Sequence, residues 1–201
     1  MHFEFLLEEP SAEKVLRNIL PSLIVGEHDF RCIVYQGKMD LLKSLPIKLR
    51  GYKRWIPGAF KIIVLVDRDD DDCFELKRKL DLIATNAGLI CKCNSQDNFQ
   101  VMNRIAVEEI ESWFFGDADA MRMAYPRLNF FERKTSFRNP DAIKNTWESL
   151  ERILQQRGYF KTGLRKTEVA NEVSKYMQPL KNRSKSFQVF WSGITECIAN
   201  K

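Results

Sequence analysis

The sequence lacks the features that mark membrane-bound or secreted proteins. No stretch approaches the roughly 20 consecutive apolar residues of a membrane span. The first ten residues contain neither a basic leader nor a cleavage site of small residues, so we expect no secretory signal. The two histidines, His2 and His28, are too isolated to support a histidine mechanism. We therefore predict a cytoplasmic protein that acts away from membranes.

Cysteines are few and do not form a familiar pattern. The five cysteines are an odd number, and none has the C-x-x-C spacing of many metal and redox sites. Cys91 and Cys93 are two apart, so a strand would place both thiols on one face. A zinc or redox role is open. Without a third and fourth ligand nearby, the two thiols are better explained as small buried hydrophobic residues.

Glycine is also scarce, with nine residues in the chain. Gly37 and Lys38 resemble the end of a phosphate-binding loop, but the earlier glycine of the G-x-x-x-x-G-K pattern is missing. This absence excludes an ATP-binding P-loop. We predict that Lys38 is either a solvated residue at the start of a helix or a contact for a phosphate group.

The residues that are present indicate a folded and moderately basic protein. Hydrophobic residues make up 44% of the chain and aromatic residues 11%, which is enough for a packed core. A length of 201 residues suits one domain, or one domain with an elaboration. The formal net charge of +5 permits a nucleic-acid partner without requiring one.

Residues 61–73, KIIVLVDRDDDDC, are the most informative stretch. The apolar run 62–66 is typical of a strand buried on both faces in a parallel sheet. Five of the next six residues are aspartate, at positions 67 and 69–72. Parallel sheets bind ligands at the carboxyl ends of their strands, and clustered carboxylates suit Mg²⁺ or Mn²⁺. The alternative is that Asp70, Asp71 and Asp72 only cap the next helix.

Strands and helices alternate along the first 120 residues. We predict strands at 2–8, 30–35, 62–66, 89–92 and 99–107, helices at 11–24, 40–50 and 73–87, and a helix or turn at 108–115. This alternation predicts an α/β protein with a Rossmann-like, mostly parallel sheet flanked by helices. Helices predicted at 118–125, 140–156, 166–177 and 187–199 would form a C-terminal helical cap. We therefore divide the chain into an α/β domain, 1–117, and a cap, 118–201, that packs on it.

Three acidic groups follow predicted strands. Glu8 ends the first strand, Asp67 and Asp69 end the central one, and the last is followed by Glu108, Glu109 and Glu111. Parallel strands would bring all three groups to one edge of the sheet. Carboxylates that converge there form a site for a hard metal ion, and a free carboxylate can deprotonate a nucleophile. Asp70 is either a further ligand or a cap, and Glu108 and Glu111 are either ligands or a solvated helix start.

Basic residues cluster outside this edge. The clusters are Lys48, Arg50, Lys53 and Arg54 with Tyr52 and Trp55 between them; Arg133, Lys134 and Arg138; and Lys181, Arg183 and Lys185. Lysine and arginine next to aromatic residues suit a phosphate backbone with stacked bases. We predict nucleic-acid contacts at Lys38, Arg54, Arg183 and Lys185. The alternative is an ordinary charged surface, with Ser184, Ser186 and Phe187 fastening the cap.

Residues 7–11, LEEPS, and 66–69, VDRD, combine a glutamate after the first strand with a D-x-D motif after a later one. They resemble the TOPRIM fold of topoisomerases, primases and nucleases of the overcoming-lysogenization-defect type. The resemblance implies a TOPRIM-like sheet in which Glu8, Asp67 and Asp69 hold Mg²⁺ for phosphoryl transfer. Glu9 stands where that pattern usually has glycine.

A larger part of the chain resembles a bacterial family of unknown function in the TOPRIM-like group, domain of unknown function 4276. The similar stretches are residues 7–11, 36–38 with 40–42, 66–70, 106–113 and 182–187. Genes of this family often lie beside ATPase genes. The resemblance therefore implies an effector of bacterial defence against phage that acts with an ABC- or AAA-type ATPase.

We predict a nuclease, or a related phosphoryl-transfer enzyme, that depends on Mg²⁺ or Mn²⁺ and acts on DNA or RNA. Its catalytic residues would be Glu8, Asp67, Asp69 and Glu111, and its metal ligands Glu8, Asp67, Asp69, Asp70 and Glu108. The sequence does not distinguish a monomer from a homo-oligomer.

Two other functions are weighed against this one. A non-catalytic module of the same fold would bind nucleic acid or an ATPase, and Glu9 and the lack of an obvious lysine or histidine near the acids favour it. A phosphate-accepting receiver domain is disfavoured. Glu8 and Glu9 are the wrong acids for that role, and Arg104 does not replace the required lysine.

Overall fold

Four parallel strands form the centre of the computed structural model, which describes residues 1–199. The strands are β1 (His2–Leu7), β2 (Asp29–Val34), β3 (Phe60–Asp67) and β4 (Val101–Ala106), in the order β2-β1-β3-β4. β3 pairs with β1 on one side and with β4 on the other, and all eight of its residues are buried. The predicted α/β fold with a parallel sheet is confirmed.

Helices connect the strands and continue beyond them. The α-helices are α1 (Pro10–Ile19), α2 (Lys38–Lys53), α3 (Cys73–Asn86), α4 (Glu111–Gly116), α5 (Ala118–Ala124), α6 (Thr146–Gln155), α7 (Lys166–Ser174) and α8 (Lys185–Ala199). Short 3₁₀ turns are η1 (Leu20–Ser22), η2 (Phe131–Arg133), η3 (Thr135–Phe137), η4 (Pro140–Ala142) and η5 (Pro179–Lys181). No helix within residues 1–199 combines the length and apolar character needed to cross a membrane.

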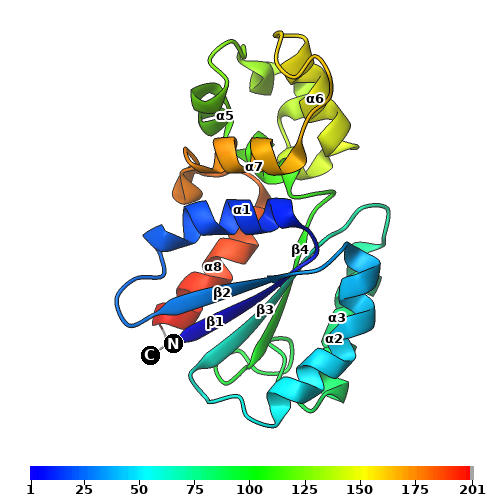
Figure 1. Cartoon of the computed structure of the whole chain (residues 1–201), viewed down its shortest axis with the longest axis vertical. Helices are drawn as coiled ribbons and strands as arrows, with labels where there is room; N and C mark the ends of the chain where they lie inside the picture. Colours follow the sequence, from blue (N-terminus) through cyan, green and yellow to red (C-terminus); the bar gives the residue numbers. More distant parts are fainter. Residues whose placement is uncertain (200–201) are drawn as a thin grey trace.

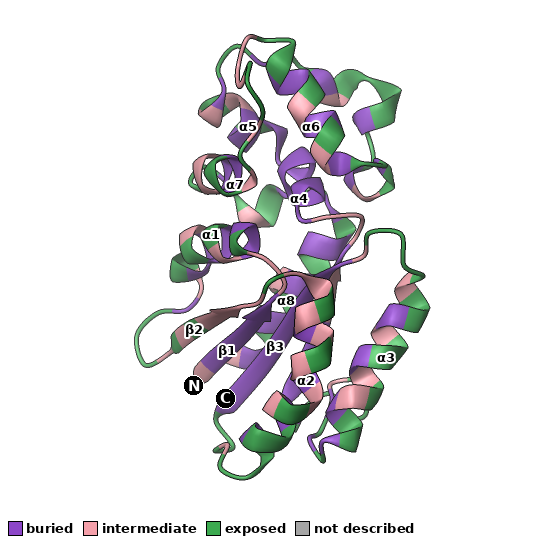
Figure 2. Cartoon of the chain, turned by 45° about the vertical axis from the view of Figure 1, so that its right-hand side comes forward, coloured by how far each residue is buried: buried purple, intermediate pink, exposed green. Residues whose placement is uncertain are grey.

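The sheet is the middle layer of three. Side chains on successive strand residues point to opposite faces. On β1, Phe3, Phe5 and Leu7 therefore join the core with α1 and α8, whereas Leu6 joins the core with α2 and α3. Figure 1 shows these two pairs of helices on opposite sides of the strands, and Figure 2 shows the purple of buried residues along β1 and β3. Edge strand β2 is only half-buried.

Three of the predicted elements differ in the structure. The predicted strand 89–92 forms a single bridge, Cys91 to Val101, because the chain turns at once: the N–H groups of Asn94 and Ser95 both donate to the carbonyl of Cys91. The predicted helix 140–156 is divided into η4 and α6 by Asn145, whose φ of 49° is left-handed. The predicted helix 11–24 ends as α-helix at Ile19 and continues as the η1 turn, which contains Pro21.

Helices α5, α6 and α7 stand together beyond the carboxyl ends of the strands (Figure 1). α7 packs on α1, where the amide of Asn18 donates to the carbonyl of Asn171 at 3.1 Å and to Ser174 Oγ at 2.8 Å. α8 then returns to cover the sheet, and the core on that face includes side chains from before and after Asp117. The division at residue 117 stays a prediction, and residues 200–201 of the predicted cap lie outside the described residues.

The start of α8 is fastened to α4 through a close backbone approach. The Asn182 amide donates to the carbonyl of Trp113 at 2.8 Å, and Trp113 Nε1 donates to Ser186 Oγ at 3.1 Å. Ser184 Oγ and the N–H of Ser186 donate to the carboxylate of Asp141 at 2.6 and 2.7 Å. Ser184, Ser186 and Phe187 are buried, so this stretch joins the last helix to the core.

Gly116 leaves room for this joint. A Cβ added there would lie 2.0 Å from Asn182 Oδ1 and 2.9 Å from the backbone N of Ser184. We expect Gly116→Ala to lower the free energy of unfolding by about 1–3 kcal/mol, because backbone must move to relieve the overlap. Urea denaturation followed by circular dichroism measures this loss.

Gly51→Ala in α2 is the matched control, since no atom of residues 1–199 outside its own stretch of helix lies within 4 Å of its added Cβ. It should leave stability unchanged or raise it by about 0.5–1 kcal/mol, because alanine is the better helix former. Equal denaturation midpoints for Gly116→Ala and the wild type would contradict the close approach.

Candidate functional site

The strand order reverses between β1 and β3, and this position is where open parallel sheets bind ligands. Two acids stand there. Glu8 directly follows β1, and Asp67 is the last residue of β3. The backbone N–H of Asp67 donates to Glu8 Oε2 at 3.0 Å, so the two strand ends are joined by an acidic side chain.

The loops after β3 and β4 are held together by their backbones. The N–H of Arg68 donates to the carbonyl of Ala106 at 2.9 Å, and that of Asp69 donates to the carbonyl of Glu108 at 2.8 Å. Asp69 and Glu108 both have positive φ, 49° and 59°. Backbone conformations that cost free energy persist where surrounding contacts enforce them, and they are frequent at functional sites.

Asp67 and Glu111 are buried acids, and the charge of Lys166 offsets only part of the burial of Glu111. Asp67 is 7% exposed, and burial together with the charges of Glu111 and Glu9 raises its pKa well above the usual value. Glu111, the first residue of α4, is fully buried, and neither of its carboxylate oxygens has a hydrogen-bond partner among residues 1–199. Burial raises the pKa of Glu111 to about 8. Such groups are costly to stability, which makes them candidates for function.

Glu9 belongs to the same group of acids. Its charge contributes to the raised pKa values of Asp67, Glu111 and Glu8. Burial is the largest cause for Glu8, whereas the hydrogen bond from Asp67 and the charge of Lys38 oppose it. Glu9 therefore adds a carboxylate to this group of acids.

Lys38 closes one side of this group. Lys38 is the first residue of α2. Its ammonium group lies 2.7 Å from Asp69 Oδ2 and 2.8 Å from Asp71 Oδ2, and it donates to the carbonyl of Arg68 at 3.0 Å. Its side chain is only 12% exposed. Burial lowers its pKa, but the hydrogen bonds to Asp69 and Asp71 raise it above the usual value. Of the two alternatives predicted for Lys38, a solvated residue does not fit this burial, and a phosphate contact stays a prediction. The sequence had shown no obvious lysine near the acids.

Lys166, a residue of the cap, lies on the opposite side of these acids from Lys38. It begins α7 and lies 3.1 Å from Glu109 Oε1. Glu109 Oε2 also accepts hydrogen bonds from Thr146 Oγ1 and the N–H of Trp147 at the start of α6, so Glu109 ties the cap to the loop after β4. Burial lowers the pKa of Lys166, but the charges of Glu111, Glu9 and Glu109 raise it. The sequence separates Lys166 from these acids by more than 50 residues, so no local pattern indicated it.

The other predicted ligands have different surroundings. Glu108 forms an ion pair with Arg68, and Asp70 lies exposed in the turn after β3. The helix cap is Asp72, which accepts hydrogen bonds from Phe74 and Glu75. One set of metal-ligand atoms within residues 1–199 lies within 4.8 Å of one another, and it contains none of the acids at this edge. Their carboxylates are electrostatic neighbours, but they do not converge on one point.

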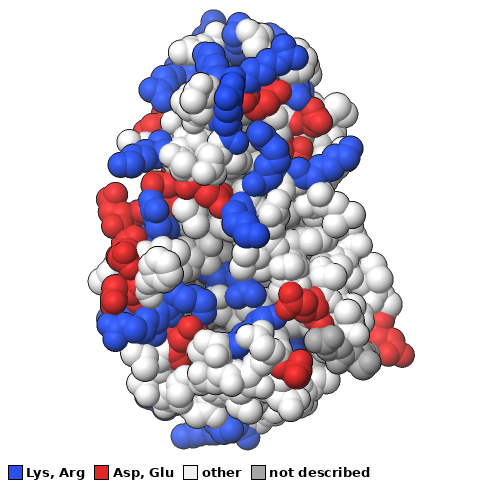
Figure 3. Space-filling view, turned by 180° about the vertical axis from the view of Figure 1, so that it is seen from behind, with Lys and Arg blue, Asp and Glu red and all other residues white. Residues whose placement is uncertain are grey.

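The predicted nucleic-acid contacts do not all lie at the acidic edge. Arg54 follows α2 beside Trp55, which packs on Phe60 at the start of β3, so Arg54 lies at the opposite end of the strands. Arg183 and Lys185 are exposed at the start of α8. Figure 3 shows lysine and arginine gathered over the upper part of the molecule, where the cap lies. Further exposed basic residues of the cap are Arg127, Arg133, Lys134, Arg138, Lys144, Arg152, Arg157, Lys161, Arg165, Lys175 and Lys181.

Comparison with known proteins matches the chain to a family. A family model with the description "Domain of unknown function (DUF4276)" matches residues 7–195. No curated protein and no solved structure matches the chain. The matched range begins beside Glu8 and includes both lysines of the site.

The raised pKa of Glu111 has a consequence for stability. The ordinary value is 4.5 and the folded value about 8, so between these pH values the folded state binds a proton that the unfolded state lacks. The free energy of unfolding should therefore fall as pH rises through this window, by at most about 1.4 kcal/mol per pH unit from this group. Glu111→Gln removes this loss, so its stability relative to the wild type should increase from pH 5 to pH 8.

Urea denaturation at each pH, with a chelator present, measures this difference. Glu148→Gln is the matched control, because Glu148 is exposed on α6. Its profile should run parallel to that of the wild type. A parallel profile for Glu111→Gln as well would mean that Glu111 titrates normally.

Proposed function

The chain belongs to the family described as Domain of unknown function (DUF4276), and from this premise we propose that it is a metal-dependent nuclease, or a related phosphoryl-transfer enzyme, with a TOPRIM-like site. The observation that carries the proposal is the pair of buried acids, Asp67 and Glu111, at the strand-order reversal of a parallel sheet. Burying neighbouring carboxylates costs free energy unless they bind protons or a cation.

The donor set suits Mg²⁺ or Mn²⁺. All the groups at this edge are carboxylate oxygens, which these hard cations prefer. Glu8, Asp67 and Asp69 would hold the metal, which would polarise a phosphate and lower the pKa of a bound water. Among residues 1–199 these acids do not form a convergent set, so side chains would have to move for them to share one cation.

Glu111 is a better fourth member than Glu108. Arg68 occupies the carboxylate of Glu108, whereas Glu111 has no such partner among the described residues. A carboxyl group with a pKa of about 8 can accept or release a proton near neutral pH. We assign to Glu111 either metal binding or proton transfer to the reacting oxygen.

The two lysines would position an anionic substrate. Lys38 and Lys166 approach the acids from α2 and α7, on the sheet side and the cap side. Lys38 is ion-paired with Asp69, for which a bound metal would compete, and this would free its ammonium group for a phosphate. A groove of about 530 Å³ between α2 and α3 begins at Lys38 and Asp71 and is open to solvent.

The basic cap supports nucleic acid as the substrate. Its exposed arginines and lysines lie at the end of the molecule toward which the strands point, and Figure 3 shows them on one face of that end. Such surfaces bind phosphate backbones without reading sequence. An ABC- or AAA-type ATPase partner and a role in phage defence complete the proposal, on the strength of the family resemblance, and both DNA and RNA remain candidate substrates.

Asp67→Asn should separate metal binding from stability. The substitution removes one buried charge, so we expect the metal-free variant to be at least as stable as the wild type. It should bind Mn²⁺ at least about tenfold more weakly and lose nuclease activity. Calorimetry with Mn²⁺ and Mg²⁺, and melting with and without Mn²⁺, test the binding. Cleavage of single- and double-stranded DNA and RNA, with the ATPase included, tests the activity.

Asp97→Asn, in the exposed loop before β4, is the matched control and should behave as the wild type in every assay. Cleavage retained in a pure Asp67→Asn preparation would refute the catalytic assignment. Wild-type protein that binds neither cation, with or without nucleic acid, would refute the metal site.

A non-catalytic scaffold is the second candidate. The ion pairs of Lys38 with Asp69 and Asp71 favour it, because they balance part of the negative charge of the loop without a metal ion. The two functions differ in how nucleic-acid binding responds to a chelator. A scaffold should keep its affinity in EDTA and lose it only with added salt, whereas binding through a metal should fall in EDTA at constant ionic strength. Fluorescence anisotropy with a labelled oligonucleotide measures both.

A further inference from the structure

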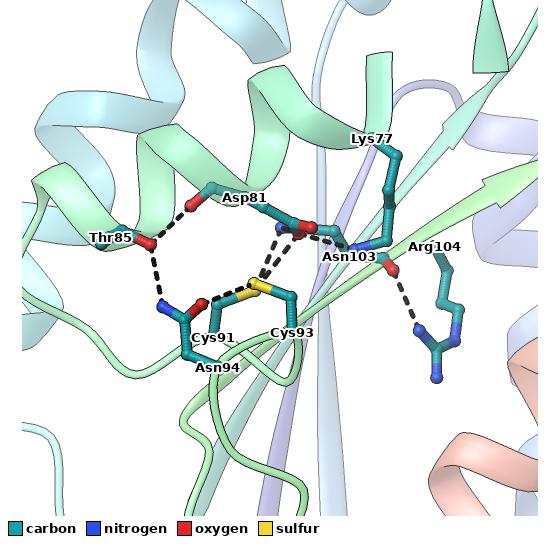
Figure 4. A network of polar contacts seen from close by, with 8 residues as sticks. All are labelled: Lys77, Asp81, Thr85, Cys91, Cys93, Asn94, Asn103 and Arg104. Atoms are coloured by element: carbon teal, nitrogen blue, oxygen red, sulfur yellow. Dashed lines mark hydrogen bonds and ion pairs between the residues drawn. The ribbon is translucent and has the colours of Figure 1, made fainter. Parts of the chain in front are cut away.

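A second group of potential ligands lies at the other end of the sheet. One oxygen of Asp81 and the Sγ atoms of Cys91 and Cys93 all lie within 4.8 Å of one another. Asp81 projects from α3, and the two cysteines come from the turn that precedes β4 (Figure 4). The turn brings the thiols together, because the N–H groups of Asn94 and Ser95 both donate to the carbonyl of Cys91.

We propose that Asp81, Cys91 and Cys93 bind Zn²⁺. Two thiolates select a borderline-soft cation and disfavour Mg²⁺, and a carboxylate is a usual third ligand of zinc. Ligand atoms of a tetrahedral zinc site lie about 4 Å apart or less, so small side-chain movements close the site. Asp81 is the ligand that the spacing of Cys91 and Cys93 could not indicate, since it is ten residues away on a helix.

Neighbouring side chains already orient the carboxylate. Asp81 Oδ1 accepts from Lys77 Nζ at 2.6 Å, from Asn103 Nδ2 at 2.7 Å and from Cys91 Sγ at 3.2 Å. Zinc would replace the proton of the Cys91 thiol and leave the other two contacts in place. Two thiolates and a carboxylate around Zn²⁺ carry a net charge of −1, which the ammonium of Lys77 balances. Groups that hold a ligand in this way support metal sites.

The position indicates a structural role. Cys91 pairs with Val101, the first residue of β4, while the acidic edge lies beyond Ala106, about 17 Å farther along the strand. The bridged segment covers the start of this edge strand, and zinc would pin it to α3. Cys93 and Asn94 are exposed, so a water molecule would supply the fourth ligand.

Metal uptake by the whole chain tests the site. Protein stripped with a chelator and kept reduced is titrated with Zn²⁺ and with Co²⁺, and bound metal is counted by mass spectrometry. The wild type should bind one Zn²⁺ per chain, melt at a higher temperature with zinc, and show thiolate-to-cobalt charge transfer with Co²⁺. Cys93→Ser, at an exposed position, should lose the charge-transfer band and most of the affinity. Lys77→Met should weaken zinc binding by roughly 10- to 100-fold.

Cys32→Ser is the matched control, because Cys32 lies on β2, away from this group. It should bind zinc as the wild type does. Absence of zinc uptake by the reduced wild type, or unchanged uptake by Cys93→Ser, would overturn the proposal. Asp67→Asn should retain the cobalt band, because the acidic edge is a separate site. A failure of one site therefore leaves the other to be judged by its own experiment.

Discussion

The complete burial of β3 is the constraint on which the rest of the structure depends. Neighbouring strands cover both sides of β3 and helices cover both faces, so its eight residues have no access to water except at the end. Asp67 stands at that end. Glu8 reaches it from the next strand, while Lys38 and Lys166 contribute positive charge from α2 and α7. Opposite charges therefore lie close together at this partly buried edge of the sheet, where electrostatic interactions are stronger than in water.

The fold could be predicted where the signal is local. The apolar run of β3 and the alternation of strands and helices are patterns of consecutive residues. The observed bounds of these elements agree with the predicted ones to within a few positions. The prediction failed where a turn competes with an extended conformation. Leu89, Ile90 and Cys91 look like a strand, but hydrogen bonds from Asn94 and Ser95 close a turn after one bridge. Asn145 divides a predicted helix because it takes a left-handed conformation. Asparagine can adopt that conformation, but whether it does so at a given position depends on the surrounding structure.

The site was predictable only in part, for the same physical reason. Glu8, Asp67 and Asp69 follow strands, so parallel topology alone places them at one edge. Lys166 and Glu9 could not be assigned, because their place depends on how the cap packs and on which way one side chain turns. Glu108 and Glu111 looked equivalent in sequence, yet one pairs with Arg68 and the other is buried in the core. Burial and long-range ion pairing are properties of tertiary structure, and they decide which carboxyl groups have shifted pKa values.

The packing of α8 on β1 has a consequence for biosynthesis. Phe190 of α8 lies 6.3 Å, between ring centroids, from Phe5 of β1, although almost the whole sequence separates them. A nascent chain that has already emerged with all four strands still leaves the Phe3 and Phe5 face of the sheet without α8. Contacts between such distant residues slow folding, and the uncovered face is a surface for aggregation or for a chaperone. This face of the sheet therefore stays exposed until the basic cap and α8 have been translated.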